Sequence, residues 1–159
     1  MIIGITATRE GLSQRQKGLF EFIMQLSKPE FVRHGDCVGG DADCYKIARA
    51  NGIATIAHPP KNDKLRAYTK DNFESYPVKD YLVRNRDIVN MSDLLIGFPL
   101  SRFKKTGGTW STIKFAKSIG KPVVYMCGDH NSISVSELNE NIRTFLIPAL
   151  SAYVRKFPA

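Results

Sequence analysis

Long hydrophobic runs and a regular cysteine pattern are both missing from this sequence. No apolar stretch approaches the ~18 residues of a membrane-spanning helix, and no basic and apolar leader follows Met1. We therefore expect a cytoplasmic protein without a membrane partner. Cys37, Cys44 and Cys127 are irregularly spaced and form no CxxC motif, so we expect neither a disulfide framework nor a bound metal.

The two common phosphate-binding motifs are missing as well. No G-x-G-x-x-G follows the first apolar run, and no G-x-x-x-x-G-K-[ST] occurs in the chain. Ordinary dinucleotide binding and P-loop chemistry are therefore not expected. We also expect no resident cofactor.

The residues that are present indicate one globular domain with an unusual charge. A length of 159 residues and an apolar content of 43% are sufficient for a single compact domain with a sizeable core. The chain has 23 Lys and Arg against 15 Asp and Glu, which gives a formal net charge of +8. Such a charge is compatible with an anionic ligand, and equally with a basic surface that serves only solubility.

Short β-branched apolar runs alternate with segments of helical spacing. The runs cover residues 2–6, 31–34, 53–57, 93–98 and 123–126, and the helical segments cover 13–26, 42–50, 80–91, 107–119 and about 135–156. This alternation predicts an α/β fold, a single Rossmann-like doubly wound, mainly parallel sheet of five or slightly more strands with helices on both faces.

The whole chain, residues 1–159, is expected to form one domain. Its core spans residues 2–126, and a C-terminal helix covers the sheet. Residues 61–77 have no periodicity, many charges and a length unusual for a connection. They are interpreted as either a mobile lid or an insertion wrapped on the sheet.

Three loops of unusual composition follow predicted strands, where open parallel sheets bind their ligands. One contains small hydroxylated residues and an Arg, and two are rich in glycine, which lets the backbone approach a ligand closely. The free N–H groups and the dipole of a helix N-terminus attract anions. These loops predict a cradle for a phosphorylated ligand, and the expected binding residues are Thr6, Thr8, Arg9, Gly35, Asp36, Gly39, Gly40, Asp41, Arg84, Asn85, Gly107, Gly108, Thr109 and Trp110.

Each of these features also has a purely structural interpretation. Glycines between a strand and a helix often serve only a tight turn, and Asp41, Thr109 and Ser111 are suitable helix caps. Arg84 has the spacing for a solvated pair with Asp87, and Trp110 is as suitable for packing as for stacking on a base. The histidines show no metal-ligand spacing, so structural roles are expected for them.

Several segments occur in an order that resembles a known superfamily. They are residues 6–9 (TATR), 34–42 (HGDCVGGDA), 84–86 (RNR), 93–99 (DLLIGFP), 107–109 (GGT), 116–117 (AK) and 120–123 (GKPV). Together they resemble the SLOG superfamily, a Rossmann-like group that includes the cytokinin-activating "Lonely guy" phosphoribohydrolases and the DNA-processing protein that loads recombinase onto single strands. The sequence is most similar to its small stand-alone members.

The resemblance implies a retained phosphate cradle without the family's catalytic carboxylate. By spacing, the Arg of the phosphoribohydrolase Arg-Lys pair falls on Arg84, and Asn85 replaces the Lys. The closing Glu of the Pro-Gly-Gly-x-Gly-Thr-x-x-Glu motif falls on Thr112, and a threonine cannot act as a carboxylate. The remaining weak candidates for a catalytic role are Asp36, Asp41 and Arg84.

Three functions are therefore open. The first is binding of a nucleotide or nucleotide-derived phosphorylated ligand that the protein senses, sequesters or carries. The second is an N-glycoside hydrolase or (deoxy)ribosyltransferase that acts on nucleotides and uses an Asp as its carboxylate. The third is single-stranded nucleic-acid binding, ranked last because the basic residues are dispersed. The resemblance also leads us to expect a homo-oligomer.

Overall fold

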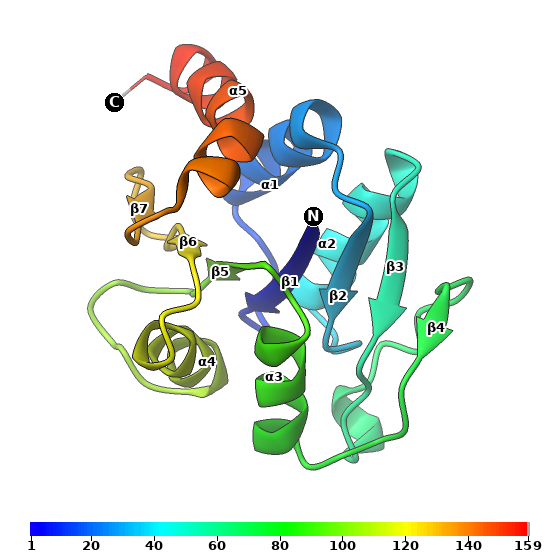
Figure 1. Cartoon of the computed structure of the whole chain (residues 1–159). Helices are drawn as coiled ribbons and strands as arrows, with labels where there is room; N and C mark the ends of the chain where they lie inside the picture. The colour runs from blue at the N-terminus through cyan, green and yellow to red at the C-terminus, as the bar shows by residue number, and fades with distance from the viewer. Residues whose placement is uncertain (159) are drawn as a thin grey trace.

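The computed structural model describes residues 1–158, which form a seven-stranded sheet flanked by helices (Figure 1). The first half of the chain contains β1 (Ile2–Ala7), α1 (Gln14–Phe22), the π-helical turn η1 (Ile23–Ser27), β2 (Phe31–His34), α2 (Gly40–Ala50), β3 (Ala54–Ala57), the 3-10 helix η2 (Asp63–Leu65) and β4 (Glu74–Ser75). The second half contains α3 (Tyr81–Asn90), β5 (Leu94–Phe98), α4 (Gly108–Ser118), β6 (Val123–Tyr125), β7 (Ser134–Val135) and α5 (Glu140–Lys156).

The strand order is β4-β3-β2-β1-β5-β6-β7, and within residues 1–158 the pairing of β6 with β7 is the only antiparallel strand pair. The predicted α/β class with a mainly parallel, doubly wound sheet is therefore confirmed. The chain builds the sheet outward from β1 to β4 and then returns to place β5 on the other side of β1. This reversal creates a topological switch point between β1 and β5, the place where open α/β sheets bind ligands.

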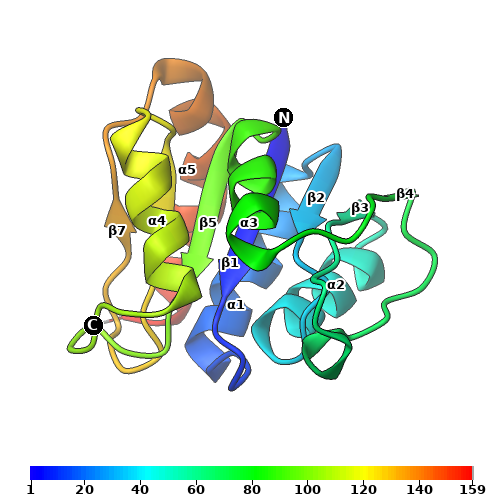
Figure 2. The ribbon, with the colours of Figure 1, turned by 90° about the horizontal axis from the view of Figure 1, so that it is seen from below.

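Helices cover both faces of the sheet. Helices α1, α2 and α5 lie on one face, and α3 and α4 lie on the other (Figures 1 and 2). Alternate strand residues face the two layers, so Ile3 and Ile5 pack with Leu19 and Leu146 in the larger core. Leu95 and Val123 pack with Ile113 of α4 in the smaller one. This burial on both faces explains why the strands read as continuous apolar runs.

Local signals define some helix boundaries well and others poorly. The side chains of Ser13 and Gln16 form the capping box that begins α1. Helix α5 begins at Glu140, later than the expected start near residue 135, because Ser134 and Val135 instead pair with β6. Asn139 caps α5 by accepting a hydrogen bond from the backbone N–H of Ile142.

No helix within residues 1–158 is both long enough and apolar enough to cross a membrane.

The segment of residues 61–77 lies along the edge of the sheet. It contains η2 and β4, and β4 pairs in parallel with β3 through Ile56–Glu74 and Ala57–Ser75. Of the two sequence interpretations, the structure therefore agrees with an insertion wrapped on the sheet. We call residues 61–77 the edge segment below.

Candidate functional site

A cavity of about 470 Å³ opens at the carboxyl ends of β1 and β5, at the topological switch point. Its walls come from the loop after β1, the loop between β2 and α2, one side of α3, and the loop between β5 and α4. The structure brings together around it the following residues expected from the sequence: Thr6, Thr8, Arg9, Gly35, Asp41, Arg84, Asn85, Gly107, Gly108, Thr109 and Trp110. Asp36, Gly39 and Gly40 do not line it.

The N-terminus of α4 opens onto this cavity without a side-chain cap. Gly107 occupies the N-cap position, and no side chain accepts a hydrogen bond from the first turn. Thr109 and Ser111 therefore do not cap α4. The first turn also contains no acidic residue, so its free N–H groups and the positive end of the helix dipole are available to an anion in the cavity.

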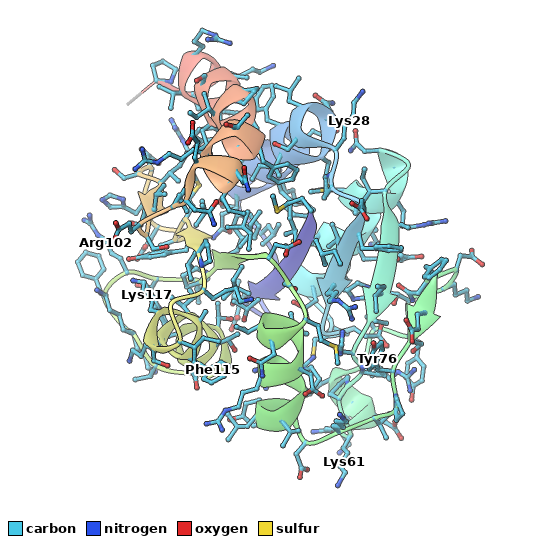
Figure 3. The ribbon with its side chains drawn as sticks, in the orientation of Figure 1. Lys28, Lys61, Tyr76, Arg102, Phe115 and Lys117 are labelled. Atoms are coloured by element: carbon cyan, nitrogen blue, oxygen red, sulfur yellow. The ribbon has the colours of Figure 1, made fainter. Side chains whose placement is uncertain are left out.

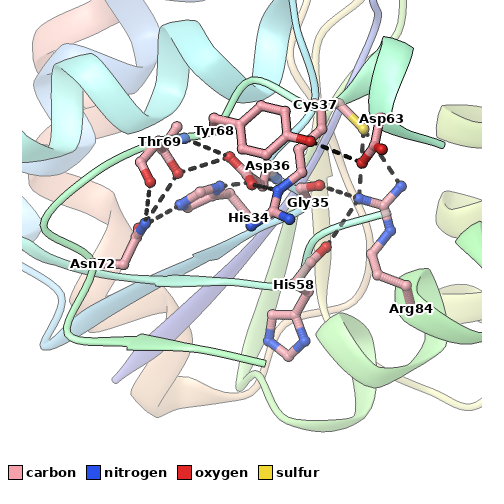
Figure 4. A network of polar contacts seen from close by, with 11 residues as sticks. His34, Gly35, Asp36, Cys37, His58, Asp63, Tyr68, Thr69, Asn72 and Arg84 are labelled. Carbon is pink, nitrogen blue, oxygen red and sulfur yellow. Dashed lines mark hydrogen bonds and ion pairs between the residues drawn. The ribbon is translucent and has the colours of Figure 1, made fainter. Parts of the chain in front are cut away.

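Arg84 is buried in the cavity wall, with 6% of its surface exposed. Its Nη1 donates hydrogen bonds to the backbone carbonyls of Gly35 and His58, and both Nη atoms approach the Cys37 thiol (Figure 4). Its Nε has no partner within residues 1–158. A Cβ on Gly35 would lie 1.9 Å from Nη1, so glycine is required for this approach. The alternative pair with Asp87 does not form, because Asp87 accepts a hydrogen bond from Lys79 Nζ at 2.6 Å.

Asp41 is the second buried charged residue of the wall, with 6% of its surface exposed. Burial raises the pKa of its carboxyl to about 6, although Arg84 and the backbone N–H groups of Cys37 and Gly35 oppose this rise. Gly39 rather than Asp41 is the N-cap residue of α2. The capping role considered for Asp41 is therefore not what the structure shows.

Asp36 faces the edge segment instead of the cavity. Its carboxylate accepts hydrogen bonds from Arg66 Nε at 2.9 Å, from the backbone N–H of Thr69 at 2.9 Å and from Thr69 Oγ1 at 2.8 Å (Figure 4). Its carboxylate therefore holds the edge segment against the end of β2. In this structure Asp36 does not contact the space in which a ligand would lie.

Gly39 and Gly40 allow α2 to begin directly beside the loop after β1. Gly39 has a φ of +90°, and a Cβ there would lie 2.0 Å from the carbonyl oxygen of Arg9. The backbone N–H of Gly40 donates to the carbonyl of Thr8 at 2.7 Å. The contacts of Gly39 and Gly40 are therefore structural. The two glycines hold Thr8 and Arg9 at the cavity.

Three further residues considered in the sequence have packing contacts. The Trp110 indole N–H donates to the Ser101 carbonyl at 3.1 Å, so its ring lies in the wall in a fixed orientation. Arg86 lies over the ring of Phe115 at 5.0 Å and does not line the cavity. The Thr112 hydroxyl donates to the Gly108 carbonyl at 2.8 Å inside α4. The family position of the catalytic Glu thus holds a buried hydroxyl that is already bonded.

Both buried histidines are held as neutral rings. An arginine can only donate, so the contact of 3.1 Å from Arg33 Nη1 makes His58 Nε2 an acceptor, and burial followed by Arg33 lowers the pKa of His58 to about 3. His34 accepts from the backbone N–H of Asp36, and burial lowers its pKa too. These contacts agree with the structural roles expected for them.

The cavity also contains residues that the sequence did not single out as ligands. Lys104 and Ser101 belong to the loop after β5, and its basic composition was a usable signal. Tyr81 and Leu65 also line the cavity, but nothing local indicated this. Their positions depend on how α3 and the edge segment pack against the sheet. Arg9, Arg84 and Lys104 together outnumber the carboxylates of Glu10 and Asp41 in the lining.

Comparisons with known proteins agree with this architecture. No family model and no curated protein matches the chain. Among solved structures, DNA processing protein A from Streptococcus pneumoniae has a TM-score of 0.60 at 20% identity, covering 94% of this chain and 56% of that one. The chain therefore spans little more than half of that protein.

Two molybdenum cofactor proteins are similar over more of their length. The molybdenum cofactor binding protein of Rippkaea orientalis has a TM-score of 0.61 at 20% identity, covering 96% of this chain and 85% of that one. The molybdenum cofactor carrier protein of Chlamydomonas reinhardtii has a TM-score of 0.59 at 17% identity and covers 98% of each chain. At these identities the likeness concerns the fold alone, and the chain shares the Rossmann-like fold of these proteins, as the sequence predicted.

Proposed function

We propose that this chain binds a nucleotide or nucleotide-derived phosphorylated ligand in the switch-point cavity, and that it senses, sequesters or carries this ligand. The observation that carries the proposal is the uncapped N-terminus of α4, which opens onto a cavity lined by Arg9, Arg84 and Lys104. Backbone N–H groups at a helix N-terminus and nearby cations are the usual partners of a phosphate.

The size and place of the cavity support a small ligand. A volume of about 470 Å³ lies within the range of small-molecule sites, roughly 300–1,000 Å³. Proteins of similar fold include ones described as binding or carrying the molybdenum cofactor, which makes that cofactor a reasonable member of any ligand panel.

An N-glycosidase or ribosyltransferase is less well supported. Thr112 offers no carboxylate, and Asp36 is occupied by Arg66 and Thr69. Of the acidic candidates that the sequence suggested, only Asp41 lines the cavity. Release of a free base from nucleotides, abolished by Asp41→Ala, would be the signature of this alternative.

Single-stranded nucleic acid is the second candidate, because of one exposed loop. Phe103 is 79% exposed, Arg102 lies over its ring at 4.6 Å, and two lysines, Lys104 and Lys105, follow it. Basic and aromatic residues of this kind bind single strands, and a DNA processing protein A from Helicobacter pylori described with a single-stranded DNA binding mode shares the fold. The other basic residues are dispersed, since Lys28, Lys61 and Lys117 project from different sides of the molecule (Figure 3).

Calorimetric titration tests the proposal. The panel consists of nucleoside mono- and diphosphates, cyclic nucleotides, ribosyl phosphates derived from NAD, inorganic phosphate, the molybdenum cofactor and a single-stranded oligonucleotide. We expect at least one phosphorylated small molecule to bind. No binding by any of the small molecules contradicts the proposal, and oligonucleotide binding that weakens steeply with salt would favour the second candidate instead.

A matched pair of variants tests whether the ligand binds at the N-terminus of α4. Thr109→Asp introduces a negative charge at the cavity, whereas Ser111→Asp introduces the same charge on the same helix outside the lining. Both changes favour the helix dipole, so neither should destabilise the fold. We expect Thr109→Asp to weaken binding of the phosphorylated ligand about 10- to 100-fold through charge repulsion, and Ser111→Asp to change it little. Equal effects of the two variants would show that only the overall charge matters.

A further inference from the structure

Two buried residues of opposite charge line the cavity without forming an ion pair. Arg84 and Asp41 are both nearly inaccessible, and both approach the backbone at Gly35. Within residues 1–158 no ion pair joins them, and the guanidinium donates to backbone carbonyls instead. Arg84 lies close enough to Asp41 to oppose the rise in its pKa, yet burial still raises that pKa overall. The protein therefore compensates the ionised Asp41 carboxylate only in part.

The Asp41 carboxylate has acceptor capacity that the protein leaves open. An ionised carboxylate can accept about four hydrogen bonds. The backbone N–H groups of Cys37 and Gly35 approach it, and no side chain within residues 1–158 donates to it. Because Asp41 also lines the cavity, a donor on a bound molecule can satisfy the open positions.

The position of Asp41 complements that of the α4 N-terminus. Asp41 follows β2, and α4 follows β5, and these two strands lie on opposite sides of β1. Neighbouring strands are about 4.8 Å apart, so the two loops begin roughly 10 Å apart across the cavity. One side favours an anion, and the other favours a hydrogen-bond donor.

We propose that Asp41 is the specificity-determining residue of the cavity, and that its carboxylate accepts a hydrogen bond from a sugar hydroxyl or a base amine of the ligand whose phosphate lies at α4. This inference rests on the proposed function and adds to it the class of ligand. A simple anion gains nothing from Asp41 and is repelled by it. A nucleotide-like ligand has both a phosphate and hydrogen-bond donors. Asp41 therefore favours nucleotide-like ligands over simple anions.

The protonation of Asp41 gives the interaction a pH dependence. The charged or titratable groups around its carboxylate are Arg84 from α3, Asp36 and Cys37 from the loop after β2, and Cys44 within α2. Only the ionised carboxylate can accept hydrogen bonds at all of its lone pairs, because protonation turns one oxygen into a donor. The preference for a donor-bearing ligand should therefore weaken as the solution is acidified and Asp41 takes up a proton.

The experiment compares four probes: adenosine monophosphate, inosine monophosphate, deoxyadenosine monophosphate and inorganic phosphate. Each is titrated into the wild type, Asp41→Asn and Asp43→Asn at neutral pH. Asp43 is a matched control because it lies in the same turn of α2 but outside the cavity, where it accepts from the Leu12 backbone N–H at 2.9 Å. We expect Asp41→Asn to lose about 10- to 100-fold in affinity for adenosine monophosphate, as for a hydrogen bond to a charged group. Its affinity for inorganic phosphate should be unchanged or higher.

The probes also test the inference in the wild type, without any variant. A hydroxyl donor predicts weaker binding of deoxyadenosine monophosphate, and an amine donor predicts weaker binding of inosine monophosphate. Equal binding of all four probes, or an unchanged nucleotide affinity in Asp41→Asn, overturns the role of Asp41 while leaving the phosphate site intact. If no probe binds at all, including inorganic phosphate, the proposed function and this inference both fail.

Discussion

Asp41 and Asp36 show how residues of one type can take different roles within a few positions of each other. Both follow β2, and nothing in the sequence distinguishes them as ligands. Asp36 adopts a φ of +51°, and its carboxylate is bonded to Arg66 and Thr69. Asp41 stands one residue inside α2, and its carboxylate lines the cavity. The sequence predicted that Asp36 and Asp41 lie near the site. Only the backbone conformation determines that Asp36 faces the edge segment and Asp41 faces the cavity.

The raised pKa of Asp41 leads to a prediction about stability. Its carboxyl titrates near 6 in the folded protein, above the ordinary value of 3.8, so the folded state holds more protons between these values and stability falls as pH rises through this window. The neutral variant Asp41→Asn avoids this loss. We expect it to be more stable than the wild type by about 1–3 kcal/mol at pH near 7.5 in urea denaturation, with the gain disappearing below pH near 4.

The control for this prediction is Asp43→Asn, which should show no comparable gain at either pH. A gain in Asp41→Asn that is the same at both pH values would contradict the explanation, because it would not arise from the ionised carboxylate. A residue that lowers stability in the ionised form while lining a cavity is typical of functional sites.

At the scale of elements, the edge segment forms part of the cavity wall through Leu65 of η2. It is held by Asp36, by the pairing of β4 with β3, and by Asn72, whose Oδ1 contacts His34 and Thr55. The sequence left a mobile lid and a wrapped insertion open. A two-residue strand has no periodicity to detect, and its pairing depends on contacts with residues far away in the chain.

Removing the charge of Asp36 should loosen the edge segment. Asp36→Asn breaks the ion pair with Arg66 Nε and leaves a single acceptor oxygen for Thr69. We expect a stability loss of about 1–3 kcal/mol and, because the segment opens locally, faster limited proteolysis within residues 61–77. Asp71→Asn is the matched control, since Asp71 is exposed on the same segment. Unchanged cleavage in Asp36→Asn would mean that the Asp36 side chain does not hold the segment, which the strand pairing and Asn72 would then hold without it.

The alternation of apolar runs and helical spacing in the sequence was sufficient to predict the central strands of the sheet. The strands β1, β2, β3, β5 and β6 lie within one or two residues of their expected positions. The edge strands β4 and β7 were missed, because each has only two residues. The switch point also follows from strand order, which the sequence pattern alone does not contain.

Most of the net charge of +8 lies outside the cavity. Lys28, Lys61 and Lys117 project from different sides of the molecule (Figure 3). The cavity, in contrast, combines a few cations with the uncapped end of α4. A homo-oligomer stays a prediction, and α5, with Ile147 and Val154 exposed, is the surface on which we expect it to form.

If the phosphate of a small ligand lies at the N-terminus of α4, a titration with adenosine monophosphate should change the amide chemical shifts at that end of the helix. We predict saturable shifts at the backbone N–H groups of Gly108, Thr109 and Trp110, together with the loop of residues 6–9 after β1. Shifts confined to the exposed loop of residues 102–105, or scattered over distant lysines such as Lys28 and Lys61, would show that the phosphate does not lie at α4.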